Sequence, residues 1–139
     1  MLTMTVAEQQ TFIGADGLEL HSSCWRPRGD ARAVVALVHG LGEHAGRYST
    51  LVTHLTAAGF AVGGFDHRGH GTSPGRRGHI GSWAEYREDV RAFLGATGKQ
   101  FPGRPMFLYG HSLGALIVTE YIIAYPGSEL AGQIGRAHV

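Results

Sequence analysis

Residues 107–118 read Phe-Leu-Tyr-Gly-His-Ser-Leu-Gly-Ala-Leu-Ile-Val, and this stretch decides the fold. An apolar run ends at Gly110, Ser112 lies in a Gly-x-Ser-x-Gly frame, and a second apolar run follows. This pattern predicts a buried strand, a very tight turn and a helix. Gly110 and Gly114 lack side chains, so a strand and a helix can pass close beside the turn.

Such a turn suits Ser112 to nucleophilic chemistry, because the hydroxyl on a strained strand-to-helix turn projects clear of the sheet. A helix that begins at Ser112 presents unpaired N–H groups and the positive end of its dipole where an oxyanion would form. Chance is the alternative explanation, since the chain has 22 glycines among 139 residues. The motif lies where an apolar strand meets an apolar helix, and this position favours the nucleophile.

The rest of the chain alternates between strand and helix patterns. The strands are expected at residues 11–13, 18–25, 33–38, 60–65 and 106–109. The helices are expected from about Tyr48 to Ala58, from a capping box at residues 82–85, and from Ser112 to about Tyr125. This alternation predicts the α/β class, with a mostly parallel sheet and helices on both faces.

Three candidate residues, Leu41, Asp66 and Ser112, fall at the carboxyl ends of the expected parallel strands. Sheets of this kind bind their ligands at that edge. The glycine-rich loop over residues 66–81 carries six glycines or prolines at its turns and is expected to be functional or unusually braced.

Three motifs resemble the monoacylglycerol lipase and lysophospholipase branch of the α/β-hydrolases. Residues 39–48 are similar to its oxyanion segment, residues 65–73 to its Asp-x-x-Gly-x-Gly-x-Ser loop, and residues 110–114 to its nucleophile elbow. Ala115 departs from the family pattern, because many members carry another glycine there. The order of the three motifs, over roughly residues 16–133, argues against coincidence.

The resemblance implies an α/β-hydrolase fold in which Ser112 is the acyl-accepting nucleophile. The backbone N–H groups of Leu41 and Leu113 would form the oxyanion hole. The residues that would support the elbow and its loops are His39, Gly40, Gly110, His111, Gly114 and Asp66. The substrate would be a fatty acyl ester with a small polar leaving group, such as a monoglyceride or a lysophospholipid, and no cofactor is expected.

Two other functions remain open on the sequence alone. One is a carboxylesterase, thioesterase or peptidase of the same fold. The other is a non-catalytic relative that binds a ligand, because fold alone does not determine function. The intact elbow favours the enzyme.

A complete catalytic triad is not expected in this chain. The family order is Ser, then Asp or Glu, then His, and the residues after the last expected helix include only Glu129 and His138 as candidates. Residues 134–139 read Ile-Gly-Arg-Ala-His-Val, which matches the translation of a common sequencing adapter. We therefore expect residues 1–133 to be the N-terminal portion of an α/β-hydrolase domain and 134–139 to be a non-native tail. The chain alone is expected to be nearly inactive, with the strand at 106–109 exposed at the sheet edge.

The other titratable residues are expected to be structural. His39 should hydrogen-bond backbone in the oxyanion loop, and His67 and His70 should brace the glycine-rich loop. Glu43 is expected to be structural, and Trp83 and Tyr86 to be core. The acids that should cap their helix or face solvent are Glu85, Glu88 and Asp89. Histidine spacings fall in loops without a cysteine pair, so no metal site is expected.

Charge and cysteine content indicate which partners and which compartment to expect. The net charge is +1 with both signs mixed along the chain, which argues against nucleic acid. Arg76 and Arg77 are expected at an exposed loop tip, and contact with a polar headgroup is the alternative. Transient contact with a membrane surface stays open for the full-length protein. A single cysteine, Cys24, and the absence of a signal-peptide pattern predict a cytoplasmic protein. The oligomeric state is not predicted.

Overall fold

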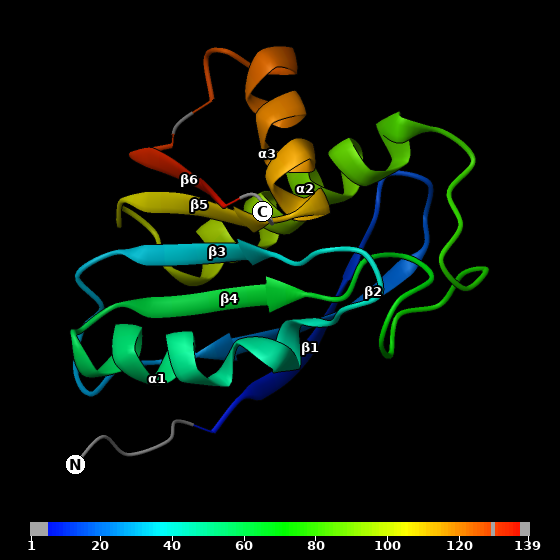
Figure 1. The fold of residues 1–139 in the computed structure, drawn as a ribbon. Coiled ribbons are helices and arrows are strands. Elements are labelled where there is room, and N and C mark those ends of the chain that lie inside the picture. The colour runs from blue at the N-terminus through cyan, green and yellow to red at the C-terminus, as the bar shows by residue number, and fades with distance from the viewer. Residues whose placement is uncertain (1–5, 129, 137–139) are drawn as a thin grey trace.

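The computed structural model describes residues 6–128 and 130–136, and its strands form a six-stranded sheet (Figure 1). The strand order is β1-β2-β4-β3-β5-β6. The pairs β1–β2 and β2–β4 are antiparallel, whereas β4, β3, β5 and β6 run parallel. The strands are β1 Glu8–Ile13, β2 Glu19–Trp25, β3 Val34–Val38, β4 Ala61–Phe65, β5 Met106–His111 and β6 Gly132–Arg136.

Helices cover both faces of this sheet. Helix α1, preceded by the 3-10 turn η1, packs on one face, and α2 and α3 pack on the other (Figure 1). These elements are η1 Ala45–Tyr48, α1 Ser49–Ala57, α2 Trp83–Gln100 and α3 Leu113–Ala124. Within the described residues, no helix combines the length and the apolar character that a membrane span requires.

The predicted α/β class with two-sided burial is confirmed. All residues of β3 and β4 are buried, as continuous apolar runs predict for central parallel strands. A Cβ at Gly63 would lie 3.3 Å from the Phe93 ring, and a Cβ at Gly64 would lie 3.2 Å from the Ala45 Cβ. These two glycines therefore let elements on opposite faces approach β4 closely.

Strand β5 is not at the edge of the sheet, so the expectation of an open edge is wrong. Strand β6 pairs with it in parallel, with Phe107 opposite Gly132 and Tyr109 opposite Ile134. An extended segment can satisfy the backbone groups of an edge strand whatever its origin. The division of the chain at residue 133 therefore stays a prediction.

Helix α2 begins where the sequence predicts, but its N-terminus is stabilised differently. Ser82 is the N-cap residue, yet its side chain makes no capping hydrogen bond. The Glu85 carboxylate instead accepts the N–H of Gly81 at 2.8 Å. Trp83 is 36% exposed rather than part of the core, whereas Tyr86 is buried. The apolar face of α2 therefore starts at Tyr86.

Candidate active site

Ser112 lies between β5 and α3 and has an unusual backbone conformation. Its φ is 55° and its ψ is −117°, and no other non-glycine residue in the described part of the chain has a positive φ. A side chain in such a conformation costs on the order of 1–3 kcal/mol, which the surrounding structure must offset. The predicted strained turn is confirmed. Helix α3 begins at Leu113, with Ser112 as its N-cap residue.

The two glycines of the motif allow β5, α3 and β3 to meet at this turn. A Cβ at Gly110 would lie 2.4 Å from the carbonyl oxygen of Gly114. A Cβ at Gly114 would lie 2.1 Å from the carbonyl oxygen of Val38. Both distances are shorter than real Cβ contacts, so neither position accepts a side chain without a shift of the backbone.

Two main-chain segments lie beside Ser112. The N–H groups of Leu113 and Gly114 open α3 and have no acceptor within the helix. The loop after β3 contacts the same turn, because a Cβ at Gly40 would lie 3.3 Å from the Ser112 Cβ. Such donors can stabilise negative charge that develops on a bound oxygen. The assignment of the Leu41 and Leu113 N–H groups as the oxyanion hole stays a prediction.

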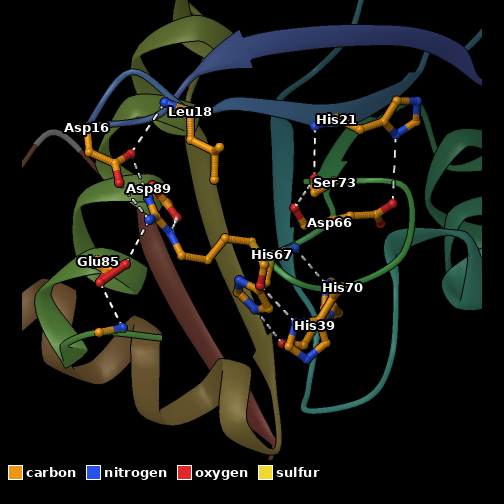
Figure 2. Close-up of polar contacts among 12 residues, drawn as sticks. Asp16, Leu18, His21, His39, Asp66, His67, His70, Ser73, Glu85 and Asp89 are labelled. Atoms are coloured by element: carbon orange, nitrogen blue, oxygen red, sulfur yellow. Dashed lines mark hydrogen bonds and ion pairs between the residues drawn. The ribbon is translucent and has the colours of Figure 1, made fainter. Parts of the chain in front are cut away.

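Three buried histidines form a cluster beside the loop that follows β3 (Figure 2). The ring centroid of His39 lies 4.1 Å from that of His67 and 5.3 Å from that of His70, and the centroids of His67 and His70 are 5.8 Å apart. His39 Nδ1 lies 2.7 Å from the carbonyl oxygen of Gly40, and its Nε2 accepts the N–H of His67 at 3.0 Å. Both nitrogens of His39 are engaged, so the predicted bracing role of His39 is confirmed.

Burial favours the neutral form of His39 and His67, and the three histidines join two loops. Burial lowers the pKa of His39 to about 4 and lowers the pKa of His67 well below its usual value. His67 Nε2 lies 2.9 Å from the carbonyl oxygen of His39, and His70 Nδ1 lies 3.1 Å from that of Arg68. The prediction that His67 and His70 brace the glycine-rich loop is therefore confirmed.

Asp66 follows β4 and ties the glycine-rich loop to η1. Its Oδ1 accepts the N–H of Ala45 at 2.9 Å, and its Oδ2 accepts both the N–H and the hydroxyl of Thr72 at 3.0 Å. Burial alone would raise the pKa of Asp66, but these hydrogen bonds outweigh it and the pKa is lowered. The predicted capping of the glycine-rich loop is confirmed, and the contact with η1 is an addition to it.

A buried ion cluster around Arg68 was not predicted. The guanidinium donates to Asp89 at 2.7 and 2.8 Å, to Asp16 at 2.8 and 2.9 Å, and to Glu85 at 2.7 Å (acids labelled in Figure 2). The Asp89 side chain is fully buried, so its interpretation as a solvated or capping acid is wrong. One signal was available, because Asp89 stands three residues after Tyr86, within the apolar stripe of α2.

The structure brings most of the predicted site residues to one edge of the sheet. Those that meet at the carboxyl ends of β3 and β5 are His39, Gly40, Leu41, Gly110, His111, Ser112, Leu113 and Gly114. Over residues 6–128 and 130–136, Ser112 Oγ makes no hydrogen bond to a histidine or a carboxylate. Glu129 and His138 lie outside the described residues. In the described ranges, no three His, Cys, Asp or Glu side chains are arranged to hold a metal ion.

The strand order and the turn at Ser112 are those of an α/β-hydrolase. The model of the family described as serine aminopeptidase, S33, matches residues 29–137, and the chain belongs to this hydrolase family. The solved monoacylglycerol lipase of Paleococcus ferrophilus is 40% identical with a TM-score of 0.73, over 85% of this chain and 42% of that one. A soluble variant of monoglyceride lipase from Saccharomyces cerevisiae, bound to a substrate analogue, is 31% identical with a TM-score of 0.79, over 97% of this chain and 45% of that one.

Curated relatives carry lipase names and are longer. Monoacylglycerol lipase of Mycolicibacterium smegmatis is 38% identical over 141 residues, which cover 99% of this chain and 50% of the relative. Human monoglyceride lipase is 36% identical over 123 residues, which cover 88% of this chain and 40% of the relative. The chain therefore spans about half the length of the curated relatives it matches.

Proposed function

We propose that this chain supplies the nucleophile and the oxyanion hole of a serine ester hydrolase. The substrate is a fatty acyl ester with a small polar leaving group, such as a monoacylglycerol or a lysophospholipid. The observation that carries the proposal is the positive φ of Ser112 between two glycines that admit no side chain. A protein that only binds a ligand has no need of a serine on a strained turn. Lipase relatives at 36–38% identity support the ester class.

In the proposed reaction, Ser112 Oγ attacks the carbonyl carbon of the ester while its proton passes to a general base. The carbonyl oxygen becomes an oxyanion and accepts hydrogen bonds from the N–H groups of Leu41 and Leu113. The alcohol then leaves with the proton, and the acyl group stays on Ser112 until water, activated by the same base, releases the fatty acid. Loss of one oxyanion donor slows such reactions by about 10²–10³-fold.

We assign the general base to a segment other than the described residues, because His39, His67 and His70 contact backbone or one another. Loss of the base of a triad lowers turnover by about 10⁶-fold. The 139-residue chain should therefore be nearly inactive. An esterase assay that compares it with the product of the gene read past the Gln133 codon measures this. Equal turnover of the two proteins would contradict the assignment.

We also propose that residues 1–133 are the N-terminal portion of a hydrolase domain and that residues 134–139 are not native. Two observations support this: the chain covers 50% of the Mycolicibacterium smegmatis lipase and 40% of the human one, and its last six residues match a translated adapter. Resequencing the locus beyond the Gln133 codon tests the proposal. It is overturned by genomic DNA that contains the same six codons and a stop.

An active-site probe separates the hydrolase from a ligand-binding relative. We expect a fluorophosphonate to label the full gene product, and Ser112→Ala to abolish the labelling. Ser49→Ala is the matched control, because Ser49 is an exposed serine at the start of α1 and should leave labelling intact. A folded protein that takes no label would support the non-catalytic function.

A substrate panel distinguishes the ester hydrolase from its alternatives. We expect the full gene product to show its highest kcat/KM on a long-chain monoacylglycerol or lysophospholipid presented in vesicles. Such substrates reside in membranes, so transient contact with a membrane surface is part of the proposal. A higher kcat/KM on a short-chain ester, a thioester or a dipeptide amide would move the assignment to a carboxylesterase, a thioesterase or a peptidase.

A further inference from the structure

The carboxylate of Glu43 lies within the loop that follows β3 and binds the backbone of that loop. Its Oε2 accepts the N–H of Gly40 and the hydroxyl of Tyr48, each at 2.8 Å. In return, the Glu43 N–H donates to the carbonyl oxygen of Gly40 at 3.3 Å. Residues 40–43 therefore form a turn whose first and last residues are connected by two hydrogen bonds.

This turn determines the orientation of the peptide between Gly40 and Leu41. The Gly40 carbonyl oxygen receives the Glu43 N–H and lies 2.7 Å from His39 Nδ1, so it points into the loop. The peptide unit is planar and trans, and the Leu41 N–H therefore points the opposite way. Gly42 closes the turn with a φ of 72°, a value that favours glycine at the third position of a β-turn.

Hydrogen bonds, rather than apolar packing, hold this part of the loop. The Leu41 side chain is 64% exposed and buries little surface. A Cβ at Gly40 would lie 3.0 Å from Glu43 Oε2, 3.2 Å from the His111 carbonyl oxygen and 3.3 Å from the Ser112 Cβ. The space beside Gly40 is thus bounded by both the Glu43 carboxylate and the nucleophile turn. A displaced carboxylate would let Gly40 and its peptide move relative to Ser112.

Glu43 is suited to this contact as an anion. Burial alone would raise its pKa, but the hydrogen bonds from Gly40 and Tyr48 outweigh burial and lower the pKa. His111 Nδ1 also lies 3.6 Å from Oε2 of Glu43. A charged acceptor forms a stronger hydrogen bond with a backbone N–H than a neutral acceptor does.

We propose that Glu43 is a positioning residue for acyl transfer: its carboxylate orients the Gly40–Leu41 peptide so that the Leu41 N–H faces the oxygen of an ester bound at Ser112. This inference rests on the proposed function, because it names how the oxyanion hole of that hydrolase is held. A misplaced Leu41 N–H stabilises the oxyanion of the transition state less, while binding of the ground state changes little. Glu43→Ala should therefore lower kcat about 10–100-fold and change KM less than about threefold.

The first experiment measures amide hydrogen exchange in the 139-residue chain itself. Glu43→Ala should accelerate exchange of the Gly40 amide by about tenfold or more, while the Ala36 amide in β3 keeps its protection. Glu43→Gln keeps an acceptor oxygen and should retain most of the Gly40 protection. Glu19→Ala removes an exposed glutamate on β2 and is the matched control. Equal exchange of the Gly40 amide in wild type and Glu43→Ala would overturn the inference.

The second experiment measures kcat and KM of the full gene product. Glu43→Ala should lose kcat, Glu43→Gln should recover part of it, and Tyr48→Phe, which leaves the Gly40 contact in place, should lose less than Glu43→Ala. The Ser112→Ala variant separates the two possible failures. Hydrolysis that survives Ser112→Ala overturns the proposed function and this inference with it. Hydrolysis that depends on Ser112 but is unchanged within about twofold in Glu43→Ala overturns this inference alone.

Discussion

The Ser112 turn and the Arg68 cluster are stabilised in opposite ways. At the turn, Gly110 and Gly114 have no side chains, and backbone atoms from α3 and from the end of β3 fill the space. At Arg68, one guanidinium is shared among carboxylates that lie 17, 21 and 52 residues away in sequence. The Ser112 turn is thus encoded within five consecutive residues, whereas the glycine-rich loop is held by contacts between distant segments.

This difference sets what each region tolerates. An added atom should disrupt the Ser112 turn, because close backbone contacts surround it. A lost charge should disrupt the Arg68 cluster, because a buried guanidinium without its partner is costly. Acid should protonate His39 at a higher pH than Asp16, the partner of Arg68 whose pKa is lowered.

The largest effect is expected for Gly114→Ala. Its Cβ would lie 2.1 Å from the Val38 carbonyl oxygen and 2.7 Å from that of His39, so the backbone must move. We expect the free energy of unfolding to fall by about 4 kcal/mol, beyond the usual cost of one extra methyl group. Urea unfolding followed by circular dichroism measures it. Gly95→Ala, in open space on α2, is the control and should raise stability by up to about 1 kcal/mol.

Asp89→Ala tests the ion cluster. It removes a fully buried carboxylate and leaves Arg68 with only Asp16 and Glu85. We expect a loss of about 3 kcal/mol in the free energy of unfolding. Asp30→Ala, at an exposed loop position, should change stability by less than about 0.5 kcal/mol. Similar values for the two variants would show that the cluster contributes no more than a surface charge.

Stability contributed by His39 should be lost at a higher pH than stability contributed by Asp16. The unfolded chain protonates His39 near pH 6.5, whereas the folded chain does so only near its lowered pKa of about 4. The unfolded state therefore binds more protons between these values, and stability falls by about 3 kcal/mol as the pH drops through that window. The hydrogen bond from Arg68 lowers the pKa of Asp16 to about 2, so the stability that Asp16 contributes is present above pH 3.8 and lost only below it.

Urea unfolding at pH 7, 6, 5 and 4 measures this profile. His39→Gln should reduce its slope between pH 6.5 and 4, and His67 should account for part of the remainder, because burial lowers its pKa as well. A profile that stays flat across this window in the wild-type chain would contradict neutral side chains at His39 and His67.

The smallest expected effect is a gain. Ser112→Gly removes the side chain from a backbone with a φ of 55°, which glycine adopts without strain. We expect the free energy of unfolding to rise by about 1 kcal/mol, while fluorophosphonate labelling is lost. Ser112→Ala keeps the Cβ and loses only the hydroxyl, so it should not gain stability. Equal stability of the two variants would show that the turn is not strained.

Much of the fold could be predicted from the sequence, because it depends on local patterns. Apolar runs at residues 33–38 and 60–65 predicted the buried strands, and a glycine-flanked serine predicted the turn at Ser112. The strand pairing of residues 134–136 could not be predicted from a local pattern. No strand pattern distinguished them, and their pairing with β5 depends on an edge that exists only in the folded sheet.

The sequence by itself determined the alternation of strands and helices and the sharp corner at Ser112, because these follow from side-chain size and hydrophobic period over a few residues. Only the tertiary structure decided the partners of the charged residues. The place of Asp89 in the apolar stripe of α2 indicates burial but not that its partner is Arg68, and nothing near Arg68 in the sequence indicates its contact with Asp16, 52 residues away. Charges act through space, so their roles depend on which distant segments the fold brings within hydrogen-bond distance.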